Sequence, residues 1–423
     1  MLSTVLTRLF GRAEPDAPDD PAARATAGGG GTALSLTGGG ARAAYQAGVI
    51  RGLARAVPGF RPDLLTGVSA GGLNAAFLAA GAQRPFAESA DALVETWRGL
   101  RAEHVYRVDR PGVATAVHRL VRRLPTVAPP AEGGFLDTTP LHAFVAQRIG
   151  PLGAPVDAIS AAIAAGALGA LAITATSYTT AEAVTWVQGG PASLPDRPPG
   201  RLVRTPIRPE HVLASAALPF FFPAVAVDDA PGGAPGGAGW YGDGGIRLTA
   251  PLAPALRLGA DRILSVNTRA ATAPEEADAD RAYPTAGRML GVLMNAVFLD
   301  VLDRDAQTLR RINALLEHVP PAQWGGFRPV DLLVIRPSID LSRLASGYEP
   351  VLPPSMRVML GRAAGAGERS PDWLSMLLFD AEYVERLVAL GEADVAARAD
   401  EVRAFLAPRE AETPAAKPAG RWR

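Results

Sequence analysis

The stretch around Ser69 constrains this 423-residue chain more than any other. A short apolar run at residues 64–68 ends just before Ser69, and an Ala- and Leu-rich helical pattern begins after Gly71. Between them, Gly67-x-Ser69-x-Gly71 has the spacing of a nucleophile elbow, a sharp strand-to-helix turn whose small flanking residues let the two elements approach. The first N–H groups of the following helix favour negative charge beside the serine. The motif therefore predicts a nucleophilic serine, although a turn that merely contains Ser69 has the same short pattern.

A glycine-rich loop precedes this motif. Residues 32–36 predict a short strand, and Gly38-Gly39-Gly40-Ala41-Arg42 follow it where a helix begins. Because successive glycines let backbone N–H groups converge on an anion, the loop suits a phosphate or a tetrahedral oxyanion. No Gly-Lys-Ser/Thr follows it, and Ala43 stands where a G-x-G-x-x-G fingerprint needs its last glycine. The loop is therefore not a Walker loop, and its glycines leave both a phosphate and an oxyanion possible.

A serine acyl hydrolase also needs a base within hydrogen-bond reach of the nucleophile. One candidate is Asp243, in an Asp-Gly-Gly turn directly after the aromatic pair Trp240 and Tyr241, although Asp–Gly is also an ordinary turn signal. The other candidates are the five histidines, which are His104, His118, His142, His211 and His318. A triad of Ser69, Asp243 and His318 would follow the chain order of α/β-hydrolases. The residue pattern by itself leaves both bases open.

Three aromatic residues, Phe220, Phe221 and Phe222, follow a short helical pattern broken by Pro219. They are candidates for the lining of an acyl pocket. Core aromatics beside a turn would have the same pattern.

Strand and helix patterns alternate along the chain. Strands are predicted at residues 170–178, 183–187, 262–266 and 331–335, with helical patterns between several of them. Repeated βα units predict an α/β fold with a mostly parallel sheet and helices on both faces. Residues 285–317 predict one long amphipathic helix.

Composition excludes several classes of function. The formal net charge is zero, so no bulk field attracts nucleic acid, and we expect no nucleic-acid partner. The chain has no cysteine, which excludes disulfides, thiolate catalysis and Cys-ligated zinc. No stretch predicts a transmembrane helix. We expect a cytoplasmic protein with peripheral membrane contact through apolar residues, at 1–10 or 289–302.

Three of these motifs, in this order and spacing, carry a family resemblance. Gly38-Gly39-Gly40-x-Arg42, Gly67-x-Ser69-x-Gly71 and Asp243-Gly244-Gly245 together resemble the patatin-like phospholipase family. Ala214-Ser215-x-Ala217-x-Pro219 and residues 251–261 match it as well, so the resemblance covers residues 32–269. The chain departs from the family pattern at Ala43, where glycine is usual, and at Thr249, where asparagine is frequent.

The resemblance implies a fold and a reaction. The implied fold is a three-layer α/β/α sandwich, with a catalytic domain at residues 32–272. Beyond the resemblance, the helical patterns of the chain predict a mainly helical C-terminal extension at 273–406. Residues 1–31 and 407–423 are expected to be a disordered leader and tail.

The implied reaction is phospholipase A-type hydrolysis of lipid acyl esters. The Ser69–Asp243 dyad acts without histidine, metal or organic cofactor, and the amides of Gly38, Gly39, Gly40, Ala41 and Arg42 bind the oxyanion. A weakly active lipid-binding or regulatory protein of the same fold is one alternative, motivated by Ala43. A lipid acyltransferase is the other.

Overall fold

The computed structural model describes residues 31–107, 136–191, 200–219, 221–228, 239–270, 301–345, 348 and 374–408. The predicted leader and tail fall almost entirely outside these residues, as do the expected domain boundary at 272 and 273 and both candidate membrane-contact segments. Phe220 and His118 also lie outside them.

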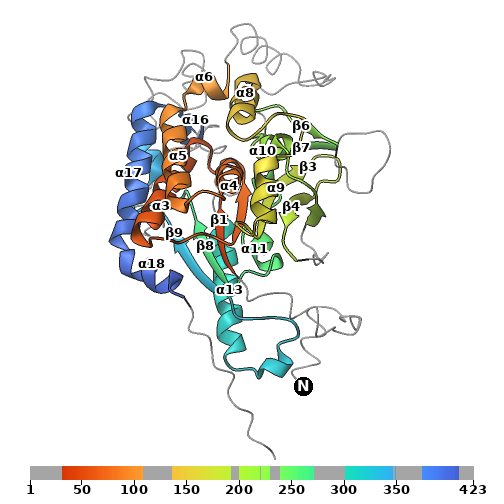
Figure 1. Ribbon diagram of the computed structural model, residues 1–423, viewed down its shortest axis with the longest axis vertical. Coiled ribbons are helices and arrows are strands. Elements are labelled where there is room, and N and C mark those ends of the chain that lie inside the picture. Colours follow the sequence, from red (N-terminus) through yellow and green to blue (C-terminus); the bar gives the residue numbers. More distant parts are fainter. Residues whose placement is uncertain are drawn as a thin grey trace, which may run out of the picture. The chain divides into compact units, whose positions relative to one another are not determined.

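Nine strands of the described residues form one sheet (Figure 1). They are β1 (Thr32–Leu36), β2 (Leu64–Val68), β3 (Ala170–Ser177), β4 (Ala183–Gly189), β5 (Arg201–Arg204), β6 (Val225–Val227), β7 (Gly239–Asp243), β8 (Arg262–Val266) and β9 (Asp331–Ile335). The order is β5-β4-β3-β2-β1-β8-β9, with β7 paired to β3 and β6 paired to β7. The pairs from β3 through β2, β1 and β8 to β9 are parallel, whereas β3 pairs antiparallel with both β4 and β7. The predicted mostly parallel sheet is confirmed.

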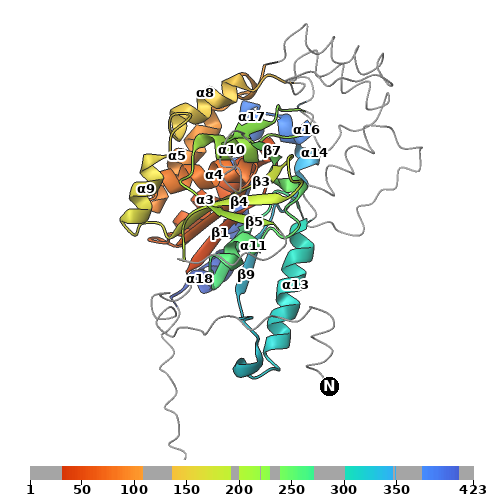
Figure 2. The ribbon, with the colours of Figure 1, turned by 90° about the vertical axis from the view of Figure 1, so that its right-hand side faces the viewer.

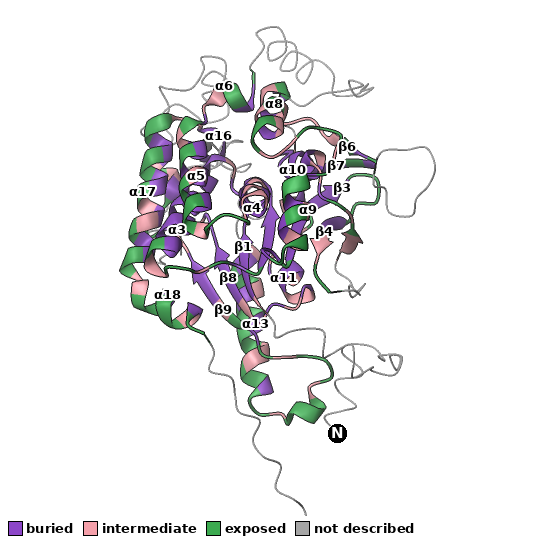
Figure 3. Cartoon of the chain, in the orientation of Figure 1, coloured by how far each residue is buried: buried purple, intermediate pink, exposed green. Residues whose placement is uncertain are grey.

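Successive residues of the central strands face two separate hydrophobic cores. Leu34 and its register partners Leu65 and Leu264 belong to one core. Ala33 and its partner Leu64 belong to the other. Because side chains alternate along a strand, a strand buried on both faces has few positions left for polar residues. The purple strands in the centre of Figure 3 show this two-sided burial.

Helices cover both faces of the sheet, as Figure 2 shows, so the expected three-layer sandwich is confirmed. The larger core is shared with α3 (Ala44–Ala56), α4 (Ala70–Ala80), α5 (Phe86–Gly99), α8 (Thr139–Arg148), α9 (Asp157–Ala164), α10 (Pro209–Ser215), α14 (Leu341–Ala345), α16 (Leu374–Leu377), α17 (Ala381–Ala397) and α18 (Ala399–Leu406). The smaller core is shared with α11 (Ala253–Arg257) and α13 (Val301–Leu316). The short α6 (Ala102–Val105) and the 3-10 turns η1 (Gly40–Ala43), η2 (Gly244–Ile246) and η4 (Pro321–Gln323) complete the described elements. Of the long helix predicted at residues 285–317, the described part is helical as α13.

The C-terminal region is mainly helical, as expected, and its elements pack against those of the first part of the chain. The predicted strand at residues 331–335 is present as β9, paired parallel with β8. Helix α17 lies along α3 with its backbone in direct contact, because a Cβ at Gly48 would lie 2.1 Å from the carbonyl oxygen of Val388. Tyr45 Oη also donates a buried hydrogen bond of 2.9 Å to Asp394. The helix layer beside α3 therefore depends on residues far along the chain.

The contact between α3 and α17 yields a stability prediction. Gly48→Ala places a methyl group against main-chain atoms that cannot move independently, so we expect unfolding to become easier by about 1–3 kcal/mol. Gly99→Ala is the matched control, because a Cβ at Gly99 meets nothing within 4 Å. Urea denaturation measures both. Equal denaturation midpoints for the two variants would contradict this account of the packing.

Candidate active site

Ser69 occupies a strained turn between β2 and α4. Its φ of 55° and ψ of −134° are rare for any residue except glycine, and such a conformation costs about 1–3 kcal/mol. The two glycines of the motif are required by close packing. A Cβ at Gly67 would lie 2.5 Å from the Gly71 carbonyl oxygen, and one at Gly71 would lie 2.4 Å from the carbonyl oxygens of both Leu36 and Thr37. The spacing of the motif therefore follows from the contact of this turn with the end of β1.

A chain of two hydrogen bonds, through α10 to β3, holds the main chain of the Ser69 turn. The backbone N–H of Ser69 donates to Ser215 Oγ on α10 at 2.9 Å. Ser215 Oγ in turn donates to the carbonyl oxygen of Thr174 on β3 at 2.6 Å. Ser215 and Thr174 are buried, so water does not compete for these bonds. Ser215, which entered the sequence analysis only through the family resemblance, is a positioning residue for the Ser69 main chain.

Asp243 ends β7 and is completely buried. Its Oδ1 accepts the N–H of Gly245 at 2.8 Å, while its Oδ2 has no partner of good hydrogen-bond geometry among the described residues. Burial raises the pKa of the Asp243 carboxyl to about 6, against the lowering effects of the nearby Ser69 hydroxyl and of the Gly245 N–H. The structure therefore brings Ser69 and Asp243 together, with the carboxylate more basic than an exposed aspartate.

The glycine-rich loop lies beside Ser69. A Cβ at Gly38 would be 3.0 Å from Ser69 Cβ, and Gly39 and Gly40 line the same pocket as Ser69. The Thr268 hydroxyl donates to the Gly38 carbonyl oxygen at 2.7 Å and so fixes the loop at its start. The N–H of Arg42 donates to the Gly39 carbonyl oxygen at 3.1 Å. Arg42 was expected to supply one of the oxyanion donors, but its amide is already bonded, so Gly38, Gly39, Gly40 and Ala41 remain as candidates.

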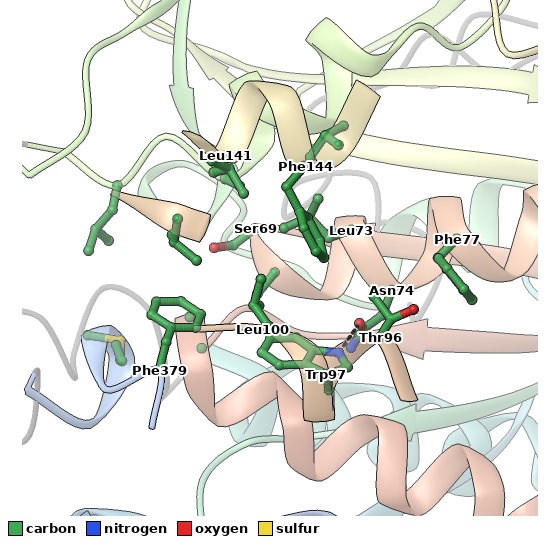
Figure 4. Close-up of a pocket in the computed structure, with 18 of the residues that line it drawn as sticks. Ser69, Leu73, Asn74, Phe77, Thr96, Trp97, Leu100, Leu141, Phe144 and Phe379 are labelled. Carbon is green, nitrogen blue, oxygen red and sulfur yellow. Dashed lines mark hydrogen bonds between the residues drawn. The ribbon is translucent and has the colours of Figure 1, made fainter. Parts of the chain in front are cut away.

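The pocket that contains both groups is almost entirely apolar (Figure 4). Its empty volume is about 920 Å³, including solvent at the mouth. It lies among α4, α5, α8, α16 and the segment after α10. Of the three aromatics expected there, Phe222 lines the pocket, whereas Phe221 is buried in the larger core and is not a lining residue. Adjacent side chains in this segment therefore have different surroundings, and Phe222 is the one that supports the expected pocket.

One wall of the pocket comes from the C-terminal region, which the sequence analysis did not connect to the site. Met376, Leu377 and Phe379 line it. The buried Arg42 side chain donates from Nε to Ser375 Oγ at 2.6 Å, which ties α16 to the glycine-rich loop. No local pattern near residue 375 signals this contact, because the two partners are 333 positions apart.

None of the histidines that the structure describes lines the pocket. His211 is buried, accepts the Arg208 N–H at 2.9 Å through Nδ1 and packs on Trp186. His104 stacks against Phe144. His318 is exposed just after α13, in the layer on the other face of the sheet. The triad of Ser69, Asp243 and His318 is therefore not assembled.

The burial of Asp243 predicts a pH-dependent change in stability. The folded protein keeps the Asp243 carboxyl protonated up to a pKa of about 6. As pH rises from 4 through 6, the free energy of unfolding of the wild type therefore falls, compared with a variant that has a neutral side chain at this position. We expect Asp243→Asn to raise the melting temperature more at pH 7.5 than at pH 4.5. Asp91→Asn, on the exposed face of α5, is the surface control and is measured at the same two pH values. A pH-independent effect of Asp243→Asn would contradict the assignment of a raised pKa.

Comparison with known proteins identifies the family to which the chain is similar. The model of the family described as Patatin-like phospholipase matches residues 34–256, about half of the chain. A search among curated protein sequences finds no significant match. Among solved structures, VipD from Legionella pneumophila is similar at 12% identity and a TM-score of 0.28, over 85% of this chain and 67% of that one.

Human GIVD cytosolic phospholipase A2 is similar at 14% identity and a TM-score of 0.42, over 89% of this chain and 60% of that one. The same human protein in complex with a methyl gamma-linolenyl fluorophosphonate inhibitor and terbium chloride aligns at 16% identity and a TM-score of 0.41, over 89% and 59%. The chain thus spans about three fifths of the length of these human structures.

Proposed function

Because this chain belongs to the Patatin-like phospholipase family, we propose that it is a phospholipase A-type lipid acyl hydrolase that works through a Ser69–Asp243 dyad. The observation that carries the proposal is the buried pair itself, a strained serine beside a carboxylate of raised pKa in an apolar pocket. A buried, incompletely bonded carboxylate is costly to a fold, and such perturbed groups cluster at catalytic sites.

The first half of the proposed reaction forms an acyl-enzyme. Asp243 takes the proton of the Ser69 hydroxyl while Oγ attacks the ester carbonyl carbon. The amides of Gly38, Gly39, Gly40 and Ala41 stabilise the resulting oxyanion. When the intermediate collapses, the bond between the carbonyl carbon and the alcohol oxygen breaks, and Asp243 returns the proton to the departing alcohol.

The second half releases the acyl group. Asp243 takes a proton from water, the hydroxide attacks the acyl-enzyme carbonyl, and the proton passes back to Ser69 as the fatty acid leaves. A carboxyl with a pKa of about 6 suits both roles, because it is mostly ionised at neutral pH and yet is a better proton acceptor than an ordinary aspartate.

The apolar pocket supports a lipid as substrate and a membrane surface as the place where it is met. No helix in the described residues combines the length and the hydropathy needed to cross a bilayer. We therefore propose peripheral contact with the bilayer during turnover.

A fluorophosphonate probe tests the nucleophile and base. Intact-mass spectrometry should show one adduct, on Ser69, in the wild-type protein and none in Ser69→Ala. Asp243→Asn should lower esterase activity by a factor of about 10³ or more, and the Ser69→Ala, Asp243→Asn double variant should be scarcely worse than either single one, because the two residues act as a unit. His318→Ala is the control and should keep full activity.

Products from mixed-lipid vesicles distinguish the alternatives. Free fatty acid and lysophospholipid support hydrolysis, whereas acyl transfer to an added acceptor lipid would replace it with a transferase. A folded wild-type protein that takes no label and releases no product would contradict the proposal in favour of a lipid-binding protein.

A further inference from the structure

Three residues of one helix face define a groove that leads away from the reactive serine. Ser69, Leu73 and Phe77 recur at intervals of four, which places them on one side of α4. All three line the pocket, and Figure 4 shows them in a row. Leu73 and Phe77 are only partly buried although they are apolar, because they form the floor of this groove.

The walls of the groove are also apolar. Helix α5 contributes Leu93 and Trp97 on one side, and α8 contributes Leu141 and Phe144 on the other. Figure 4 shows Leu141 near Ser69 and Phe144 above Leu73, on the opposite side of the groove from Trp97.

The polar side chains along the groove already have protein partners. Asn74 accepts the indole N–H of Trp97 at 2.8 Å and donates to Gln46 at 3.0 Å and to the Ala43 carbonyl oxygen at 3.2 Å. The Thr96 hydroxyl donates to the Ala92 carbonyl oxygen at 2.8 Å. A polar lipid headgroup would gain little from these engaged groups. A hydrocarbon chain fits the groove better.

On α4 the lining of the pocket ends at Phe77, because no later residue of this helix lines it. On α8 the exposed Arg148 lies one turn beyond Phe144, with its guanidinium 5.6 Å from the centre of the Phe144 ring. We therefore take Phe77 as the far end of the groove along α4.

The geometry points to a length limit. Phe77 lies eight positions after Ser69, the N-cap of α4, which corresponds to about 12 Å at about 1.5 Å per residue. An extended acyl chain advances about 1.25 Å per C–C bond, so roughly ten carbons fill the groove. We infer that the groove along α4 holds the acyl chain of the substrate and favours chains of about eight to twelve carbons, with Leu73 and Phe77 as specificity-determining residues. This inference rests on the proposed hydrolysis at Ser69, which fixes where the ester carbonyl of the substrate lies.

Binding of uncharged esters to Ser69→Ala tests the groove without turnover. Methyl esters of straight-chain fatty acids with four to sixteen carbons displace an apolar fluorophore from the protein. Affinity should rise by up to about fourfold per methylene until roughly ten carbons and then level off. Affinity that rises steadily to sixteen carbons would overturn the inference.

Two variants that block the groove at different distances from position 69 should shorten the preferred acyl chain by different amounts. In the Ser69→Ala background, Leu73→Trp fills the groove about 6 Å from position 69, so the plateau should move to about five carbons. Phe77→Trp narrows the far end and should shorten the plateau by only one or two carbons, without weakening the shorter esters. Leu315→Trp, at a 57% exposed position on α13, is the control and should leave the profile unchanged. Equal loss at every chain length in both groove variants would overturn the inference.

The wild-type protein separates this inference from the proposed function. If affinity levels off with chain length but the wild-type protein hydrolyses no p-nitrophenyl ester, the proposed hydrolase function is refuted and the groove is still assigned as an acyl-chain site. Hydrolysis whose kcat/KM ignores acyl length would refute the groove alone.

Discussion

The contact of main chain with main chain at the turn after β2 is the constraint on which the rest of the structure depends. The Cα of Gly71 lies against the carbonyl groups that end β1, and Gly67 lies against the backbone of Gly71, so neither position has room for a side chain. This packing holds Ser69 at a positive φ and brings the end of β1 beside it. The glycine-rich loop continues from that strand end, so the candidate oxyanion donors reach Ser69 as a direct consequence of how two parallel strands and one helix pack.

The candidate active site lowers the free energy of unfolding of the protein. A strained serine and a buried carboxylate of raised pKa each raise the free energy of the native state. They persist because surrounding elements hold them, through Ser215 for the serine main chain and Gly245 for the carboxylate. The two hydrophobic cores and the close α3–α17 contact supply the stability that offsets this cost.

The features that sequence reasoning predicted are those with a local signal. The Gly67-x-Ser69-x-Gly71 spacing is a property of one turn. Residues 332–335 form an apolar run whose last three residues are buried, and such a run predicts a strand in any parallel sheet. Features that depend on tertiary packing were missed. Phe221 and Phe222 are adjacent and identical in type, and only their surroundings decide which one lines the pocket. The α16 wall has no local signal, because an ordinary apolar segment reaches the glycine-rich loop through a contact with a residue 333 positions away.

The pH dependence of ester hydrolysis tests the central claim most directly. If Asp243 is the base, kcat/KM for a soluble ester should fall as pH drops through about 6, with a half-maximal value near the pKa of this carboxyl. The same dependence should remain in His318→Ala, and the residual activity of Asp243→Asn should no longer follow it. A transition near pH 6 that survives in Asp243→Asn would show that another group accepts the proton and would contradict the account.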